Sequence, residues 1–401
     1  MDRPALELAD IFRLDGPAYR ERYAESMNSQ QKQVMHAIEV CRTAALGGHV
    51  DQCDYCGHRR ISYNSCGNRH CSKCQSLAKT EWLEKHQAQL LPVPYFHVVF
   101  TLPDGIASIA WQNKKVVYNI LFRAASETLR CIAADPKHLG AKIGFLAVLH
   151  TWGQNLLFHP HLHCVVPGGG LSPDRKRWVP SRKRFFLPVR VLSRLFRGRF
   201  IHYLQKAYSA GKLRFHGSLQ QLNDPEKFDD LLKRCRQPEW VVYSKPPFGG
   251  PDQVLDYLGR YTHRVAISNH RLVHLEDGKV TFRWRDYKDG NKQKSMTLDA
   301  LEFIRRFLMH VLPHGFVRIR HYGFLANASR EVNLCLCRQF LGVAQINMEE
   351  SSVEDWKQRY ERLAGESINL CPECRQGNMM VVEIIEPFHR NRKLPAQMDS
   401  S

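Results

Sequence analysis

The sequence predicts an α+β fold, in which helices flank a sheet and a small cysteine-rich module precedes them. From about residue 91 onward, runs of β-branched and aromatic residues alternate with amphipathic helical patterns, as expected for such a sheet. Hydrophobic residues make up 43% and charged residues 24% of the chain, which excludes a mostly disordered protein. The length of 401 residues favours two or three domains.

The first 48 residues have helical patterns. Asp15-Gly16-Pro17 interrupts the first of them, because glycine and proline disfavour the interior of a helix. A second helix is expected from about Ser29 to Ala45, where Gly47-Gly48 ends it.

Cysteine and histidine residues then crowd into a stretch that is poor in aliphatic side chains. Two Cys-x-x-Cys pairs, Cys53 with Cys56 and Cys71 with Cys74, are separated by 14 residues, which is the spacing of a structural zinc site. Cys66 and His70 lie between or beside the pairs, where they either complete a second ion or support the first. Since the stretch cannot bury enough apolar surface to fold alone, we expect Zn²⁺ to stabilise it.

A third Cys-x-x-Cys pair, Cys371 with Cys374, is half of a zinc knuckle near the C-terminus. Its nearest cysteine partners in sequence are Cys335 and Cys337, and a further zinc site there is one alternative. The remaining cysteines, including Cys41, resemble ordinary core residues. Nothing in the sequence marks secretion, so the thirteen cysteines indicate metal binding in a reducing, cytoplasmic compartment.

The region after residue 91 is expected to contain strands and helices in alternation. The predicted strands are 95–100, 143–152, 156–166 and 240–243, with a polar meander over 272–298, and the predicted helices are 111–133, 189–207, 251–263 and 301–312.

Three histidines alternate along one predicted strand, His159-Pro160-His161-Leu162-His163. Because successive side chains of a strand point to opposite faces, the three imidazoles share one face while Leu162 points into the core. Two or three of them can therefore reach one metal ion. The alternative interpretation is that the histidines lie on a strand face that contacts only solvent. Imidazole alone would favour Zn²⁺, whereas substrate phosphate oxygens would favour Mg²⁺ or Mn²⁺.

Two tyrosines, Tyr257 and Tyr261, lie four residues apart on a predicted helix and therefore share one face. Arg260 and Arg264 flank them, although a pair of core aromatics is the alternative interpretation. A nearby divalent cation and arginines would favour the phenolate, since free phenols are rarely ionised at neutral pH. Attack on a phosphodiester would form a 5′-phosphotyrosine bond and free a 3′-hydroxyl, which preserves bond energy for rejoining.

Together, these motifs resemble the HUH nuclease signature with two tyrosines. The Cys53–Cys74 cluster, and the stretches 95–103, 159–170 and 257–272, are similar to the bacterial rolling-circle transposases of the IS91-like insertion-sequence family, over about residues 30–330.

The resemblance implies a fold, a set of site residues and a substrate. The fold is an HUH endonuclease-type antiparallel sheet flanked by helices, with an N-terminal zinc-binding module. His161 and His163 correspond to the metal ligands, and Tyr257 and Tyr261 correspond to the nucleophiles. A third ligand is required, for which His159 and Gln154 are the candidates. The implied substrate is single-stranded DNA, often with a terminal hairpin.

Three domains follow from these patterns. Residues 1–90 form the predicted helical and zinc-binding module, 91–330 the catalytic domain, and 331–401 a C-terminal region with a possible zinc knuckle and a mobile tail.

The charge of the chain indicates a polyanionic partner. The 58 basic and 39 acidic residues give a net charge of +19, for which DNA is the first candidate and an anionic membrane surface the rival. Eleven basic residues and no acidic residue lie between Arg175 and Lys206, with aromatic residues interleaved, although a solvated face is the alternative. The DNA-binding candidates are Arg175, Lys176, Arg177, Arg182, Lys183, Arg184, Arg260 and Arg264.

These observations favour a transposase that works on DNA in the bacterial cytoplasm, in association with the nucleoid. A replication initiator or relaxase of the same chemistry is one alternative, and a non-enzymatic zinc-module regulator that binds DNA is another. No apolar stretch approaches the roughly 20 residues that cross a bilayer, so no membrane partner is expected. The sequence leaves the oligomeric state open.

Overall fold

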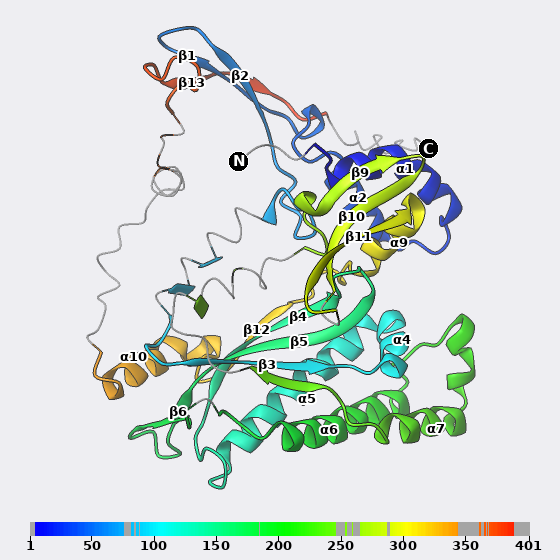
Figure 1. Cartoon of the computed structure of the whole chain (residues 1–401), viewed down its shortest axis with the longest axis vertical. Coiled ribbons are helices and arrows are strands. Elements are labelled where there is room, and N and C mark those ends of the chain that lie inside the picture. The colour runs from blue at the N-terminus through cyan, green and yellow to red at the C-terminus, as the bar shows by residue number, and fades with distance from the viewer. Residues whose placement is uncertain are drawn as a thin grey trace, which may run out of the picture.

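The structure is a computed structural model, and its elements form three parts that lie along the long axis of the molecule (Figure 1). A five-stranded sheet with its helices lies at one end, a small three-stranded sheet lies at the other, and a helical module with a second three-stranded sheet lies between them. The structure describes residues 5–75, 82–83, 86–87, 89–183, 185–245, 253–254, 259, 265–286, 289–343, 361, 365, 367 and 369–388.

The five-stranded sheet is antiparallel throughout. Its strands, in spatial order, are β12 (Ile319–Gly323), β4 (Gly144–Trp152), β5 (Phe158–Pro167), β3 (Tyr95–Thr101) and β8 (Val242–Lys245). The strands predicted at 95–100, 143–152 and 156–166 are therefore present, and they lie at the centre of the sheet. In the β4–β5 register, His150 lies opposite His161 and Val148 lies opposite His163.

Helices cover one face of this sheet. Figure 1 shows α5 and α6 below the strands, with α4 and α7 beside them. The alternate residues Phe96, Val98 and Phe100 of β3 point to this face and pack with buried helix residues in one core. The helices are α4 (Asp104–Gln112), α5 (Lys114–Ala134), α6 (Val189–Ser209) and α7 (Pro225–Arg236).

The opposite face carries the histidines and a second apolar cluster. Val148 and Val165, which alternate with the residues of the helix-covered core, pack there with Val254 and with Leu334 of α10 (Arg330–Phe340). The short hairpin β6 (Gly169–Leu171) and β7 (Trp178–Pro180) contributes Leu171 to the same cluster.

The N-terminal helices share a core with residues far along the chain. Buried residues of α1 (Leu8–Arg22) and α2 (Ser29–Glu39) pack against the meander β9 (Leu272–Glu276), β10 (Lys279–Asp286) and β11 (Lys292–Asp299) and against α9 (Ala300–Met309). Phe12 of α1, for example, meets Phe307 of α9 edge to face, with ring centroids 5.3 Å apart.

Two expectations for this region differ from the structure. The first helix does not end at Asp15-Gly16-Pro17, because α1 runs through Pro17 without interruption. Proline removes one backbone hydrogen bond, but the buried face of α1 compensates by packing in the shared core. The second helix is also shorter than predicted, since it ends at Glu39 and a short 3-10 helix, Ala44–Leu46, follows.

The small sheet joins the two ends of the described chain. Its strands are β1 (Gly48–Cys53), β2 (Arg59–Tyr63) and β13 (Met379–Ile385), and β1 lies between the other two with antiparallel pairing on both sides. The boundaries predicted at residues 90 and 330 therefore separate segments that pack together in space.

Candidate metal centre and nucleic-acid interface

Three histidines on the face of the central sheet that lies opposite helices α4 to α7 bring their ring nitrogens together. His150 comes from β4, and His161 and His163 come from β5, with ligand nitrogens all within 4.8 Å of one another. The ring of His163 has its centroid 4.4 Å from that of His150 and 4.7 Å from that of His161. One cation can therefore contact all three side chains, which are the ligands that Zn²⁺ and other divalent transition metals accept.

The third histidine of this group differs from both sequence candidates. His159 is exposed and is not part of the group, although it lies on the same strand. Gln154 lies in the turn after β4, where its backbone carbonyl accepts a hydrogen bond from Arg271. The residue in the group, His150, lies directly opposite His161 on the neighbouring strand. His150 can be identified as a member of the group only from the pairing register of β4 and β5, which the sequence does not reveal.

Hydrogen bonds fix which nitrogen of each β5 histidine can bind a metal. His161 Nδ1 lies 2.6 Å from the carbonyl oxygen of His159, and since a carbonyl only accepts, this nitrogen carries the proton. The Nε2 lone pair of His161 is then the one suited to a metal. His163 Nδ1 is likewise engaged, at 2.8 Å from Nε2 of His97, so His163 also presents Nε2.

His97 is a buried neighbour that no sequence motif marks. It lies on β3, only 3% exposed, and its ring is parallel to that of His163 with an interplanar angle of 4°. Burial, with nearby Lys245 and His161, lowers the pKa of His97 to about 3. The ring is therefore neutral at pH 7, and it can accept the Nδ1 proton of His163 in the way that outer-shell groups orient metal-binding histidines.

The two predicted nucleophiles, Tyr257 and Tyr261, lie outside the described residues. Val254, three positions before Tyr257, is fully buried in the apolar cluster on the histidine face of the sheet. Gly259, between the two tyrosines, is also buried.

The predicted basic stripe is divided between two faces of the molecule. Arg175, Lys176 and Arg177 are exposed in the turn of the β6–β7 hairpin, which packs on the histidine side of the sheet through Leu171. Arg175 donates a hydrogen bond to the side chain of Asn333 at 2.7 Å.

The loop after β7 carries the next basic residues. Arg182, Lys183 and the aromatic Phe185 are exposed there, and Phe185 is 45% exposed. Arg184, Arg260 and Arg264 lie outside the described residues.

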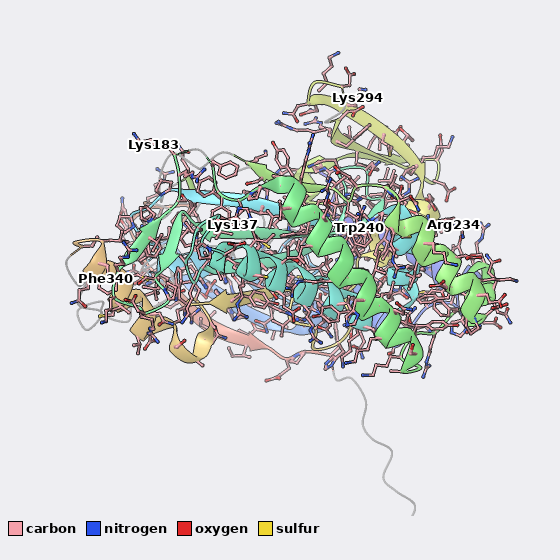
Figure 2. The ribbon with its side chains drawn as sticks, turned by 90° about the horizontal axis from the view of Figure 1, so that it is seen from below. Lys137, Lys183, Arg234, Trp240, Lys294 and Phe340 are labelled. Atoms are coloured by element: carbon pink, nitrogen blue, oxygen red, sulfur yellow. The ribbon has the colours of Figure 1, made fainter. Side chains whose placement is uncertain are left out.

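The arginines of α6 lie across the sheet from the histidines, because α6 packs in the helix-covered core. Several of them also have local partners: Arg199 pairs with Glu127 at 2.9 Å, and Arg197 donates to the carbonyl oxygen of Pro238. Figure 2 views the molecule from the side of α6 and α7, with Lys183 at its margin and away from these helices. The hairpin is therefore better placed than α6 to contact a strand of DNA at the histidines.

The six predicted zinc ligands of the N-terminal module do not form a single site. Cys66, Cys71 and Cys74 gather with Cys41, and the four sulfur atoms lie within 4.8 Å of one another. Cys41 therefore differs from the ordinary core residue that the sequence suggested. Sulfur separations such as the 3.6 Å between Cys66 and Cys74 match a tetrahedral ion, for which zinc–sulfur bonds of about 2.3 Å place sulfurs about 3.8 Å apart.

The other predicted ligands lie elsewhere. His70 is buried outside this group, where its Nε2 accepts from the backbone N–H of Leu312 at 3.5 Å, and burial lowers its pKa well below the ordinary value. Cys53 and Cys56 form a separate group with Cys371 and Cys374. The sequence alternative for that C-terminal pair, Cys335 with Cys337, lies on α10 and is not part of the group.

In the described part of the chain, no helix is both long and apolar enough to cross a membrane.

Comparison with known proteins assigns the chain to a family. Residues 144–332 match the family described as "Putative transposase", and residues 11–102 match the transposase zinc-binding domain. The protein named "Putative transposase y4qJ" of Sinorhizobium fredii is 60% identical over 387 residues, which cover 96% of this chain and 97% of that protein.

A second relative is more distant. The transposase for insertion sequence element IS801 of Pseudomonas savastanoi pv. phaseolicola is 28% identical over 305 residues, which cover 75% of this chain and 70% of that protein. No solved structure matches the chain. The two family matches and the extent of the first similarity show that this chain belongs to the IS91-like family of insertion-sequence transposases.

Proposed function

We propose that this transposase nicks and rejoins single-stranded DNA at the ends of an insertion sequence, through a metal-assisted 5′-phosphotyrosine intermediate in a rolling-circle type of transposition. The observation that carries the proposal is the convergence of His150, His161 and His163 on one face of an antiparallel sheet. Three imidazoles whose nitrogens converge on one position are the donor set of a metal site, which supports metal-assisted chemistry.

The three histidines would hold Mg²⁺ or Mn²⁺ together with the phosphate oxygens of the DNA. The donor set fits a divalent cation, because the hydrogen bonds of His161 and His163 leave Nε2 of each for coordination. Imidazoles alone favour Zn²⁺, and the phosphate oxygens of bound DNA would shift the preference to Mg²⁺ or Mn²⁺. When bound, the ion polarises the scissile phosphate and favours ionisation of a nearby phenol. His97 would keep His163 in the correct tautomer and orientation.

Tyr257 and Tyr261 would be the nucleophiles. The phenol of one tyrosine gives up its proton, its oxygen forms a bond to phosphorus, and the bond between phosphorus and the 3′ oxygen breaks, so that the 3′ oxygen takes up a proton and leaves as a hydroxyl. The second tyrosine can then capture the next strand by the same kind of attack, and rejoining is the reverse reaction, in which a free 3′-hydroxyl attacks the phosphotyrosine bond and releases the phenol. The burial of Val254 on the histidine face supports this role, since it holds the start of the tyrosine-bearing segment on that side of the sheet.

The DNA would approach along the basic hairpin and the loop after it. Arg175, Lys176, Arg177, Arg182 and Lys183 are exposed and can contact phosphates, while Arg184, Arg260 and Arg264 remain candidates from the sequence. Phe185 is exposed beside them and can stack on an unpaired base. A single strand suits this arrangement because its bases are available for stacking.

We further propose that Cys41, Cys66, Cys71 and Cys74 hold the structural Zn²⁺ of the zinc-binding domain. The four sulfurs have tetrahedral spacing, and they join the segment after α2, through Cys41, to residues 66–74 beside the shared core. The ion would therefore fix the N-terminal helices against the segment that leads into the catalytic sheet.

A covalent adduct tests the proposed chemistry. We expect the protein, incubated with single-stranded DNA from the element end and Mn²⁺ or Mg²⁺, to give a DNA-linked band on a denaturing gel. Replacement of both Tyr257 and Tyr261 by phenylalanine should remove this band. The control Tyr243→Phe removes a 49% exposed phenol from β8 of the same sheet and should leave the band unchanged. A folded protein that forms no adduct with any divalent metal would instead favour a DNA-binding regulator.

A further inference from the structure

Two Cys-x-x-Cys turns from opposite ends of the chain face each other in the small sheet. Cys53 Sγ lies 3.7 Å from Cys374 Sγ, and Cys56 Sγ lies 3.7 Å from Cys371 Sγ. All four sulfurs lie within 4.8 Å of one another. Sulfurs about 3.8 Å apart surround a tetrahedral zinc ion, whereas disulfide-bonded sulfurs would be only about 2.05 Å apart.

Both turns offer backbone N–H groups to their own sulfurs. Cys53 Sγ accepts from the amides of Tyr55 and Cys56, each at 3.4 Å, and Cys374 Sγ accepts from the amide of Gly377 at 3.4 Å. Such donors stabilise the negative charge of a thiolate, which is the form of cysteine that binds metals.

Each turn also ends with a residue in the left-handed region. Gly57 follows the first turn with φ of +75°, and Arg375 follows the second with φ of +54°. The two turns are therefore built alike, as two halves of one four-thiolate site.

The sheet around this group has almost no hydrophobic core. Its only buried cluster among the described residues consists of Cys53, Cys371 and Met379, with Cys374 packed against it. Apart from Met379, most apolar side chains of β13 are exposed, and Ile384 is 65% exposed. Burial of apolar surface therefore contributes little to holding β13 against β1 beyond the backbone pairing of the two strands, and a bound metal would supply further stability.

The contacts between the two ends are otherwise polar. The backbone N–H of Asn378 donates to the side chain of Asp54 at 2.7 Å, and the backbone N–H of Asp54 donates to the carbonyl of Asn378. Arg59 pairs with Glu383 at 3.2 Å, but both side chains are more than half exposed. Exposed ion pairs contribute little, so these contacts set the register and do not hold the ends together.

We propose that Cys53, Cys56, Cys371 and Cys374 bind a second structural zinc ion, which joins the C-terminal strand to the N-terminal module. Neither family model covers all four cysteines, since the match to the zinc-binding domain includes Cys53 and Cys56 but ends at residue 102, and the transposase match ends at residue 332. The ion spans 315 positions of sequence between Cys56 and Cys371. The zinc-binding module is therefore completed by the C-terminal segment, and the chain is closed into a loop through the catalytic domain.

Elemental analysis of the full chain tests the proposal. We expect two zinc ions and no stoichiometric iron per wild-type chain after dialysis, and one zinc ion in Cys371→Ser/Cys374→Ser. The control Cys335→Ser, which changes an exposed cysteine of α10, should keep both ions. Two zinc ions in the double variant, a single ion in the wild type, or iron in place of zinc would overturn the proposal.

Alkylation of the unmodified protein gives a second readout that needs no variant. Cys56, Cys131 and Cys335 are all exposed, so exposure alone predicts that an alkylating reagent labels the three at similar rates. A bound zinc ion protects only Cys56, because its thiolate is coordinated. We expect mass spectrometry to show Cys56 unlabelled until a chelator is added, with Cys131 and Cys335 labelled throughout. Rapid labelling of Cys56 in the zinc-containing protein would refute the site.

Discussion

The hydrogen bond between His97 and His163 should control how tightly the catalytic ion is held. Nε2 of His97 lies 2.8 Å from Nδ1 of His163, and both rings are buried, at 3% and 7% exposed. Replacing His97 by alanine leaves Nδ1 of His163 without this acceptor, and the ring loses the contact that fixes its orientation. Loss of such an outer-shell partner typically weakens metal binding about 10- to 100-fold, or about 1.4–2.8 kcal/mol.

The measurement is the Mn²⁺ concentration that gives half-maximal adduct formation, at pH 7 with saturating DNA. We expect it to rise about 10- to 100-fold in His97→Ala, with a smaller loss in adduct yield at saturating Mn²⁺. His97→Gln retains an acceptor oxygen and should recover part of the affinity. A thermal melt separates this effect from loss of folding, since the affinity shift must appear at temperatures where both variants are folded.

The reasoning fails if His97→Ala, while folded, has the wild-type Mn²⁺ dependence. That result would mean that His163 does not bind the ion through Nε2, or that no ion binds at the histidines. A fall in adduct yield at every Mn²⁺ concentration, without a shift of the midpoint, would also contradict an outer-shell role.

Three further changes separate the roles inferred from the structure. His150→Ala should lower the rate of metal-dependent nicking more than about 100-fold. His159→Ala, which changes a histidine outside the converging group, should nick at a rate within about threefold of wild type, and equal losses in the two variants would exclude His150 as the third ligand. Cys41→Ser should contain one zinc ion fewer than wild type by elemental analysis and should unfold at a lower temperature. The control Cys131→Ser, which changes an exposed cysteine, should keep the wild-type zinc content and unfolding temperature. Gly323→Ala should destabilise the fold by more than about 2 kcal/mol in urea titrations, because φ is +61° and the added Cβ would lie 1.8 Å from a backbone carbonyl oxygen; an unchanged midpoint would contradict the tight approach of β12 and β4.

Local pattern predicted the central sheet well. On the strand predicted at 156–166, which is β5, the alternation of His161, Leu162 and His163 predicts their faces, and the structure places Leu162 in the helix-covered core and both histidines on the other face. A period of two residues depends only on neighbours in sequence, which explains why the prediction was possible.

The composition of each metal group could not be predicted in the same way. His150 reaches His161 through strand pairing, and Cys371 reaches Cys56 across 315 positions, so both depend on tertiary structure. The spacing of Cys53, Cys56, Cys71 and Cys74 indicates zinc but does not show which cysteines group together, because two Cys-x-x-Cys pairs near in sequence can each lie in a different group, as they do here.

The basic stripe shows a similar limit. Charge counted along the chain grouped Arg175 with Arg199, but the structure puts Arg175 on a hairpin of the histidine side and pairs Arg199 with Glu127 behind the sheet. Basic residues that follow one another in the sequence can therefore lie on different faces, so their number overestimates how many can contact one strand of DNA. The tyrosine pair stays a prediction, since Tyr257 and Tyr261 lie outside the described residues.

Mass spectrometry of a trapped adduct would decide whether histidines and tyrosines act at one place. The wild-type protein should carry nucleotide on Tyr257 or Tyr261 after reaction with single-stranded DNA and Mn²⁺, and His163→Ala should carry none while keeping its fold. Nucleotide on any other residue, or an equal yield on the tyrosines of folded His163→Ala, would show that the imidazoles and phenols do not share one reaction centre.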